Sequence, residues 1–281
     1  MRKLLIIFFS LFTVLASGQR FPFPTSAHLG ESYSNAYYTA YHNAMTSPWQ
    51  GDTAIAFNDM LDSLDNDDYL DSMYVFYMFA STSKGDALIN VANPGTYDAD
   101  DPTAVDFTRL RYVEGDSAAG NYLSTNFNPS TAGVPRNDIT LGVGIANNLQ
   151  DQDYVFGAGT NIRFRPRSPS DLTRLHINST NYSAYGHSNS IGHWYLSRPS
   201  SSTQTHILNG SQVDTESDAS TGVQDAELLI FAWTAPPAQP PSINYQVTYF
   251  FVMNGSVNAT KAADIKEDIE AFLDYIGGGI E

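Results

Sequence analysis

HILNGSQV, residues 206–213, holds the sharpest local structural signal of the chain at its centre, Asn209-Gly210. Asn and Gly both accept positive φ, and a type I′ turn needs positive φ at both of its central residues. The sequence therefore predicts a tight hairpin that joins one strand at 206–208 to another at 211–213. Such a hairpin favours antiparallel β-structure, and the rest of the chain extends the same pattern.

Short apolar runs between Gly, Pro, Asn and Ser turns continue on both sides of the hairpin. Many short strands at this spacing indicate a sandwich or jelly roll of two antiparallel sheets, which we expect over residues 84–260. Residues 74–79 form a further bulky apolar run of strand length. The other predicted strands are 139–145, 154–156, 161–165, 174–177, 193–197, 206–208, 227–233 and 245–253.

Two helices are predicted outside the strands. Residues 52–64 place apolar side chains mostly at i, i+3, i+4 and i+7, and Asp52 can cap the N-terminus. Residues 261–276 form one apolar stripe, and Gly277-Gly278-Gly279 ends that helix. Residues 36–48 are weakly helical. The expected fold class is mainly β, with a short N-terminal helical region and a C-terminal amphipathic helix.

The N-terminal residues have the three parts of a secretory signal peptide. Arg2 and Lys3 precede an apolar run over 4–15, and small residues follow at 16–18. The run is too short for a permanent membrane span, so we expect secretion, with a retained hydrophobic arm as the alternative. The regions expected are a signal-like segment at 1–18, an arm with a short helical region at 19–83, and the sandwich with its closing helix at 84–281.

Composition excludes several classes of function. The net charge of −16 argues against partners such as nucleic acid or an anionic membrane, because phosphate binding needs clustered Lys and Arg. Only 16% of the residues are charged, and 17 Tyr and 16 Phe are typical of extracellular β-rich proteins. The chain has no Cys, so it has no disulfide, no thiolate metal site and no Cys nucleophile.

A search for catalytic motifs finds none. The chain has no Gly-x-Ser-x-Gly elbow, no phosphate loop and no His-Glu-x-x-His helix. Retaining glycosidases of jelly-roll type need a pair of carboxylates about 5 Å apart, commonly displayed on one strand face as Glu-x-Asp-x-x-Glu. The chain has no such string. The nearest fragment, Glu216-Ser217-Asp218, lacks a third acid at the right offset, so we interpret it as a solvated turn. We therefore expect a protein that is not an enzyme.

No cofactor is expected either. The acidic run 65–68 (DNDD) with Asp71 resembles a Ca²⁺ loop, but it lacks the Gly that such a loop needs at its sixth position. A plain acidic linker at a helix end is favoured over a Ca²⁺ site there. The acids Asp98, Asp100 and Asp101 receive the same interpretation.

The candidate binding residues lie on one strand. In the predicted strand HWYLS, Trp194 and Leu196 share one face, while His193 and Tyr195 share the other, with Arg198 just beyond the strand. In the simpler interpretation Trp194 packs into the core and the opposite face is merely polar. In the alternative, His193, Tyr195 and Arg198 line an exposed face on which a sugar ring stacks.

Four segments follow one another along the chain: FYMFASTSKGDALINVANPGTYDA (76–99), FTRLRYVEGDSAAGNYLSTNFNPSTAG (107–133), GHWYLSR (192–198) and HILNG (206–210). In this order they resemble a family of phage-associated proteins with a concanavalin A-like (laminin-G-like) jelly roll, and the resemblance covers roughly residues 36–280. It implies that Ala87–Pro94 is an early strand and that Asn93-Pro94-Gly95 is the turn where the domain begins. It implies no catalytic residues.

Several functions stay open. The resemblance implies a non-catalytic surface protein, a phage virion fibre or decoration component that contacts glycans or assembles with copies of itself or with other virion proteins. The alternatives are a secreted bacterial surface adhesin or extracellular assembly subunit, a polysaccharide lyase or hydrolase on the same fold, and a purely structural building block. Low charge and the Pro-rich arm at 20–35 predict self-association. The expected location is extracellular, on a virion surface or secreted.

Overall fold

The computed structural model describes residues 35–116, 120–233 and 244–280, all of which belong to one compact unit. The signal-like segment at 1–18 and residues 19–34 of the arm lie outside the described residues. No described helix is both long enough and apolar enough to cross a bilayer.

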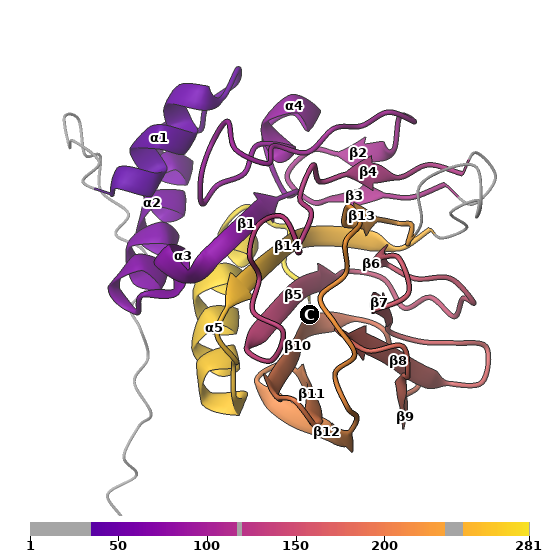
Figure 1. Ribbon diagram of the computed structural model, residues 1–281. Coiled ribbons are helices and arrows are strands. Elements are labelled where there is room, and N and C mark those ends of the chain that lie inside the picture. Colours follow the sequence, from indigo (N-terminus) through magenta and orange to yellow (C-terminus); the bar gives the residue numbers. More distant parts are fainter. Residues whose placement is uncertain (1–34, 117–119, 234–243, 281) are drawn as a thin grey trace, which may run out of the picture. The chain divides into compact units, whose positions relative to one another are not determined.

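Strands dominate the described chain, with helices near its two ends (Figure 1). The helices are α1 (Ala36–Ala44), α2 (Gly51–Asn66), α3 (Tyr69–Ser72), α4 (Lys84–Ala87) and α5 (Ala259–Tyr275). The strands are β1 (Met73–Met78), β2 (Asp106–Thr108), β3 (Tyr112–Glu114), β4 (Leu123–Ser124), β5 (Ile139–Ile145), β6 (Phe156–Ala158), β7 (Ile162–Arg165), β8 (Leu172–Ile177), β9 (Ser183–Gly186), β10 (Gly192–Ser200), β11 (Thr203–Leu208), β12 (Ser211–Ser217), β13 (Leu229–Ile230) and β14 (Gln246–Asn254).

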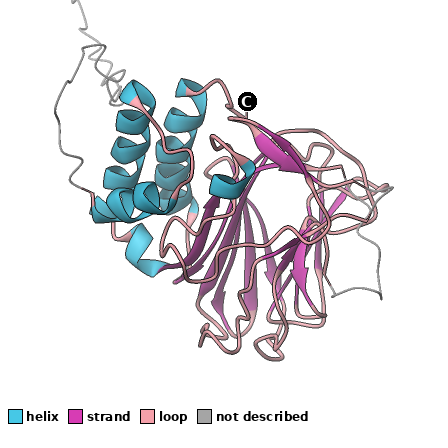
Figure 2. Cartoon of the chain, turned by 90° about the horizontal axis from the view of Figure 1, so that it is seen from above, coloured by secondary structure: helices cyan, strands magenta, loops and turns pink. Residues whose placement is uncertain are grey.

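The strands form two antiparallel sheets, as the sequence predicts. The larger, eight-stranded sheet has the order β12-β11-β10-β5-β14-β3-β2, with β1 also paired to β14. The smaller, six-stranded sheet has the order β4-β13-β6-β7-β8-β9. Figure 2 shows the two sheets facing each other. Aliphatic and aromatic side chains from both sheets form a shared core. The prediction of a mainly β sandwich is confirmed.

The hairpin at 206–213 has the predicted geometry. Asn209 and Gly210 have φ of 50° and 76°, and Leu208 pairs with Ser211 across the turn. Gly210 is needed for a second reason, because a Cβ at this position would lie 2.7 Å from the Cβ of Ala263 in α5. The hairpin tip therefore packs directly against the C-terminal helix.

Helices cover the outer face of the larger sheet. The structure has more helices than the sequence predicts. In addition to α2 and α5, which occupy the predicted ranges, the structure has α1, α3 and α4. The rings of Trp49 and Phe57 contact Phe272 of α5, at centroid distances of 5.5 and 4.9 Å. In Figures 1 and 2, α1, α2, α3 and α5 lie on the side of the larger sheet that faces away from the smaller one.

The predicted start of the sandwich at residue 84 is too late. β1 pairs in register with β14, for example Phe76 with Phe251 and Met78 with Tyr249. The sheet therefore begins at Met73, inside the range assigned to the arm and helical region. The apolar run at 74–79 has the predicted strand conformation over most of its length, but its partner is a strand more than 170 residues later in the chain.

The expected strand at Ala87–Pro94 is wrong, since these residues form the end of α4 and a series of turns. The fully buried Asn90 explains why. Its side-chain oxygen accepts from the amide of Phe76 at 2.9 Å, and its nitrogen donates to the carbonyl of Tyr74 at 3.1 Å. The Asn90 side chain thus takes the place of a neighbouring strand beside β1, because it satisfies backbone groups that would otherwise be buried without partners.

Candidate functional site

The predicted exposed face on β10 is wrong, because His193, Tyr195 and Arg198 are all fully buried. Trp194 is fully buried in the core, as the simpler interpretation predicts. His193 and Tyr195 do share the opposite face, but α5 covers it. Gly142 and Gly144 of β5 leave room there for the rings of Phe251 and Tyr249, which a Cβ at either glycine would meet at 2.2–2.5 Å.

A buried polar network replaces the predicted sugar contacts. Nε2 of His193 lies 2.7 Å from a carboxylate oxygen of Glu270 in α5, and Nδ1 lies 2.9 Å from the hydroxyl of Tyr249. The other carboxylate oxygen of Glu270 accepts from the amide of Ile280 at 2.9 Å. Burial opposes the charged form of Glu270, but the contacts with His193 and Ile280 outweigh it and lower the pKa below its ordinary value. This network fastens the C-terminal helix to the sheet.

Arg198 lies on the opposite face from His193 and Tyr195. Its guanidinium donates to the carbonyl of Asp218 at 2.9 Å and to the Asp218 carboxylate at 3.1 Å, and its Nε donates to the carbonyl of Ile177 in β8. Gln204 also donates to Asp218. Arg198 therefore ties the two sheets together, and the structure does not bring it to a common site with the other two residues.

The acids near 216 also differ from the prediction of a solvated turn. β12 carries Asp214 and Glu216 at alternate positions on the face that looks toward the smaller sheet, and Asp218 follows just beyond the strand. Burial raises the pKa of Asp214, while burial and the nearby charges of Asp214 and Asp218 raise the pKa of Glu216. The strand thus presents a carboxylate pair, which the local sequence reading missed because it placed residue 216 in a loop.

Cationic side chains gather on the outer face of the smaller sheet. Antiparallel pairing sets Arg163 of β7 opposite His176 of β8, and Arg165 opposite Arg174. The alternate residues of the same strands, such as Phe164 and Leu175, point into the core. Strand alternation therefore places the three arginines and His176 on the face that points away from the larger sheet.

Three aromatic rings accompany these cations. The guanidinium carbon of Arg163 lies 3.5 Å from the ring centroid of Trp233, and that of Arg174 lies 4.5 Å from the centroid of Tyr182. Tyr154 lies 5.5 Å from the guanidinium carbons of both Arg163 and Arg165. Tyr182 is 50% exposed and, with Tyr275, is one of two large apolar side chains that the described structure leaves exposed. We call this set the basic–aromatic face; its members are Tyr154, Arg163, Arg165, Arg174, His176, Tyr182 and Trp233.

The charge of the basic–aromatic face at neutral pH comes from its arginines. Burial and the positive charge of Arg163 lower the pKa of His176 to about 4, so its imidazole is neutral at pH 7. Burial also lowers the pKa of Arg163, and burial together with Arg174 lowers that of Arg165, although arginines stay charged under all ordinary conditions. The face therefore combines aromatic rings, three guanidinium groups and a neutral imidazole.

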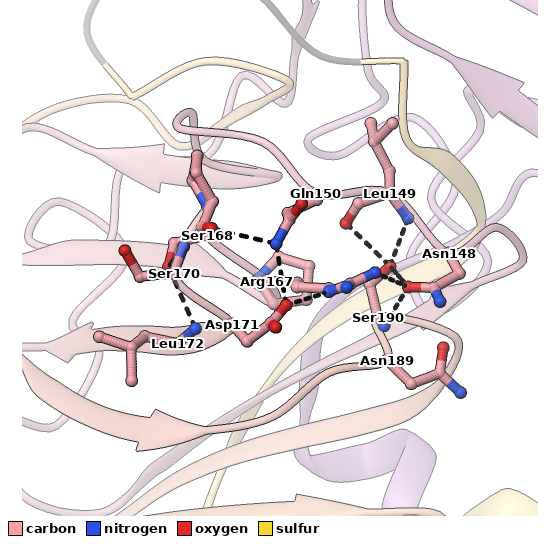
Figure 3. Close-up of polar contacts among 12 residues, drawn as sticks. Asn148, Leu149, Gln150, Arg167, Ser168, Ser170, Asp171, Leu172, Asn189 and Ser190 are labelled. Atoms are coloured by element: carbon pink, nitrogen blue, oxygen red, sulfur yellow. Dashed lines mark hydrogen bonds and ion pairs between the residues drawn. The ribbon is translucent and has the colours of Figure 1, made fainter.

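A polar network at one end of the sandwich holds the loops that lead to this face (Figure 3). Arg167 donates to Asp171 at 2.8 Å and to the side chain of Asn148 at 2.9 Å, and Gln150 also donates to Asp171. The hydroxyl of Ser190 accepts from the amide of Leu149 at 2.8 Å. These bonds join the β5–β6, β7–β8 and β9–β10 connections, so they fix the ends of the two strands that carry the cations.

Three of the acids considered for Ca²⁺ contact protein groups. Asp98 accepts from the amides of Asn90 and Gly95, Asp101 pairs with Lys84, and Asp65 accepts from Asn35. Within the described ranges, no three His, Asp or Glu side chains stand together as metal ligands would.

Comparison with known proteins finds similarity in structure but not in sequence. No protein-family model matches the chain, and no curated protein matches it. The Trypanosoma rangeli sialidase superposes with a TM-score of 0.51 at 11% identity, covering 81% of this chain and 40% of the sialidase. The same sialidase in complex with sialic acid gives a TM-score of 0.51 at 11% identity, over 80% of this chain and 39% of that one.

The receptor-binding domain of botulinum neurotoxin mosaic serotype C/D gives a TM-score of 0.51 at 11% identity, over 70% of this chain and 51% of that domain. The chain therefore matches about half or less of the length of these proteins. At such identity the likeness shows the fold alone, a β-sandwich.

Proposed function

We propose that this chain is a non-catalytic surface protein that binds glycans through the basic–aromatic face. The observation that carries the proposal is the exposed ring of Tyr182 beside the guanidinium of Arg174. An exposed aromatic ring stacks on the C–H face of a sugar, while guanidinium groups hydrogen-bond to sugar oxygens. Because the face lies on a rigid sheet whose loops are tied down, its side chains are already in place for a ligand.

Single sites of this kind are weak. A stacked ring contributes on the order of 1 kcal/mol beyond the area that it buries, so useful attachment needs many copies presented together. This requirement suits a virion fibre or decoration protein, which is the role that the resemblance to phage-associated jelly rolls supports. Self-assembly through the arm at 19–35 and an extracellular or virion-surface location remain predictions from the sequence. A secreted bacterial adhesin would use the same chemistry.

The comparisons are compatible with this proposal. One of the similar structures is a sialidase in complex with sialic acid, and another is a receptor-binding domain. We take from them only that a sandwich of this kind can present a binding face, since fold does not determine function.

Replacing Tyr182 by Ala should abolish measurable glycan binding and leave the thermal unfolding midpoint nearly unchanged, because the ring is half exposed. Binding is measured on a glycan array and then by titration calorimetry with the best glycan. Tyr275→Ala is the matched control, since Tyr275 is 41% exposed but lies on α5, away from the smaller sheet. Equal loss of binding in the two variants, or none in either, would remove Tyr182 from the site.

A polysaccharide hydrolase or lyase is the second candidate, and the carboxylates of β12 are the observation that favours it. Successive side chains on one strand face stand about 7 Å apart, and inverting glycosidases hold their two carboxyl groups about 6.5–9.5 Å apart. Asp214 and Glu216 occupy such positions, and both have raised pKa values.

The proposal of a non-catalytic protein predicts that no polysaccharide is cleaved. A reducing-sugar assay and an absorbance assay for unsaturated products, run over a panel of polysaccharides, should both stay at background. Turnover that Asp214→Asn or Glu216→Gln abolishes, while Asp225→Asn leaves it intact, would establish the enzyme instead. Asp225 is a suitable control because it is an exposed acid outside β12.

A further inference from the structure

We propose that the glycan bound at the basic–aromatic face is acidic, and that its carboxylate or sulfate group is held by Arg163 and Arg174 beside the ring of Tyr182. This inference rests on the proposed function and adds the chemical class of the ligand. It follows from the placement of the arginines, from the absence of acids paired with them in the described structure, and from one arginine being almost completely buried.

The first argument is the missing counter-charge. The chain has 30 acidic and 14 Lys and Arg residues, so it offers more than two acids for every Lys or Arg. The ion pairs found among the described residues are Lys84–Asp101, Arg167–Asp171, His193–Glu270 and Arg198–Asp218. None of them includes an arginine of the basic–aromatic face. Asp153 influences the pKa of Arg165 through space but forms no ion pair with it.

The second argument is the register of β7 and β8. Arg165 and Arg174 are direct cross-strand partners, and like charges in this position destabilise a sheet. Each guanidinium in the set is instead accommodated by a ring or a carbonyl, such as Trp233 for Arg163 and the carbonyl of Gln152 for Arg165. Such contacts do not neutralise charge. An anion bound over the strands would, and its binding would be favoured by the repulsion that it relieves.

The third argument concerns unmatched donors. Arg165 is only 6% exposed, and its Nε, like that of Arg174, is buried with no hydrogen-bond acceptor among the described residues. Buried donors in folded proteins have partners as a rule, and where a protein partner is missing an ion or ligand is a common explanation. Guanidinium groups bind carboxylate and sulfate oxygens through charge-assisted hydrogen bonds that discriminate strongly against neutral groups.

A nucleic acid is a less suitable anion for this face. With a net charge of −16, the whole protein repels a long polyanion whose affinity depends on many phosphate contacts. A sugar with one acidic group on a ring places a single charge between the arginines and leaves its C–H face for Tyr182. The geometry thus favours an acidic oligosaccharide, in which charge and a stackable ring belong to the same residue.

The experiment compares matched acidic and neutral glycans. The probes are sialyllactose against lactose, oligogalacturonate against its methyl ester, and a sulfated galactan oligomer against the unsulfated oligomer; a DNA duplex serves as a polyanion without sugar rings to stack. We expect the acidic member of at least one pair to bind, and binding to weaken with added salt. The first two pairs test carboxylates and the third tests sulfate, so the source of the charge is identified.

The variants are Arg163→Gln and Arg174→Gln, with Arg111→Gln as the matched control, an exposed arginine in the β2–β3 turn of the other sheet. Each of the first two should weaken binding of the acidic glycan about 10- to 100-fold, as loss of charge-assisted hydrogen bonds predicts, and the control should leave it unchanged. Arg174→Lys, which keeps the charge, should fall between Arg174→Gln and the wild type. Thermal unfolding of every variant verifies folding.

The other outcomes are distinct. If both members of a pair bind equally and Tyr182→Ala abolishes both, the acidic class is wrong and the proposed function stands. If no glycan binds, both proposals fail. Binding of the DNA duplex that is as tight as that of the glycan and equally dependent on Arg163 and Arg174 would show a general polyanion site and overturn the inference.

Discussion

Trp194→Ala is expected to lower the free energy of unfolding by about 3–5 kcal/mol, the range for truncating a large buried aromatic side chain. Trp194 is fully buried between the sheets, and its ring lies 5.4 Å from that of Phe164 in the smaller sheet. The substitution also leaves the carbonyl of Ser190 without the indole N–H, which now donates to it at 2.9 Å. Urea denaturation followed by fluorescence and circular dichroism measures the change.

The matched control for this prediction is Tyr275→Ala, which removes an exposed ring and should change the free energy of unfolding by less than about 0.5 kcal/mol. The slope of the transition with urea should stay the same in both variants, because the surface exposed on unfolding is little altered. A loss below 1 kcal/mol for Trp194→Ala would contradict the placement of this side chain in the core.

Glu270→Ala is expected to lower the free energy of unfolding by about 2–6 kcal/mol, because two buried groups lose their hydrogen-bond acceptor and each such loss costs about 1–3 kcal/mol. Glu270 is 8% exposed and accepts from both His193 and the amide of Ile280. Without the Glu270 carboxylate, the His193 ring and the Ile280 amide lose their hydrogen-bond partner, and a contact between α5 and the sheet is lost. Glu267→Ala, an exposed position of the same helix, should change stability little.

The Glu270 contribution should also depend on pH. The folded pKa of Glu270 lies below the ordinary value of 4.5, so folding favours the ionised form. The contribution is therefore complete above about pH 5 and disappears as the pH falls through the folded pKa. The difference in free energy of unfolding between wild type and Glu270→Gln should shrink as the pH is lowered from 6 to 3. A difference that stays constant over this range would show that the Glu270 charge adds nothing to stability.

Local signals in the sequence predict local structure well here. Asn209-Gly210 specifies its turn because both residues adopt positive φ readily, and residues 261–276 show the stripe of a helix that packs on one side. Alternation also separates the Trp194 face from the Tyr195 face correctly. The same alternation places Arg163 with Arg165, and Arg174 with His176, on one face of their predicted strands.

Strand alternation by itself could not identify the candidate site, because it does not tell which strand face is exposed. Around β10 both faces of the larger sheet are buried, one by the smaller sheet and the other by α5 and the N-terminal helices. In the smaller sheet the face away from the core keeps a half-exposed ring, that of Tyr182. The sequence pattern of a strand with one polar face is therefore the same whether that face contacts water or a helix.

The sequence by itself determined the hairpin, the strand alternation, the amphipathic helix and the mainly β class, because each depends on residues that are neighbours along the chain. Only the tertiary structure decided which strand faces are accessible. His193 is covered through a contact with Glu270, 77 residues later, and Asn90 takes the place of a strand beside β1 through contacts with residues 14 and 16 positions earlier. Exposure depends on where distant segments pack, and that placement depends on the whole core, not on any short stretch.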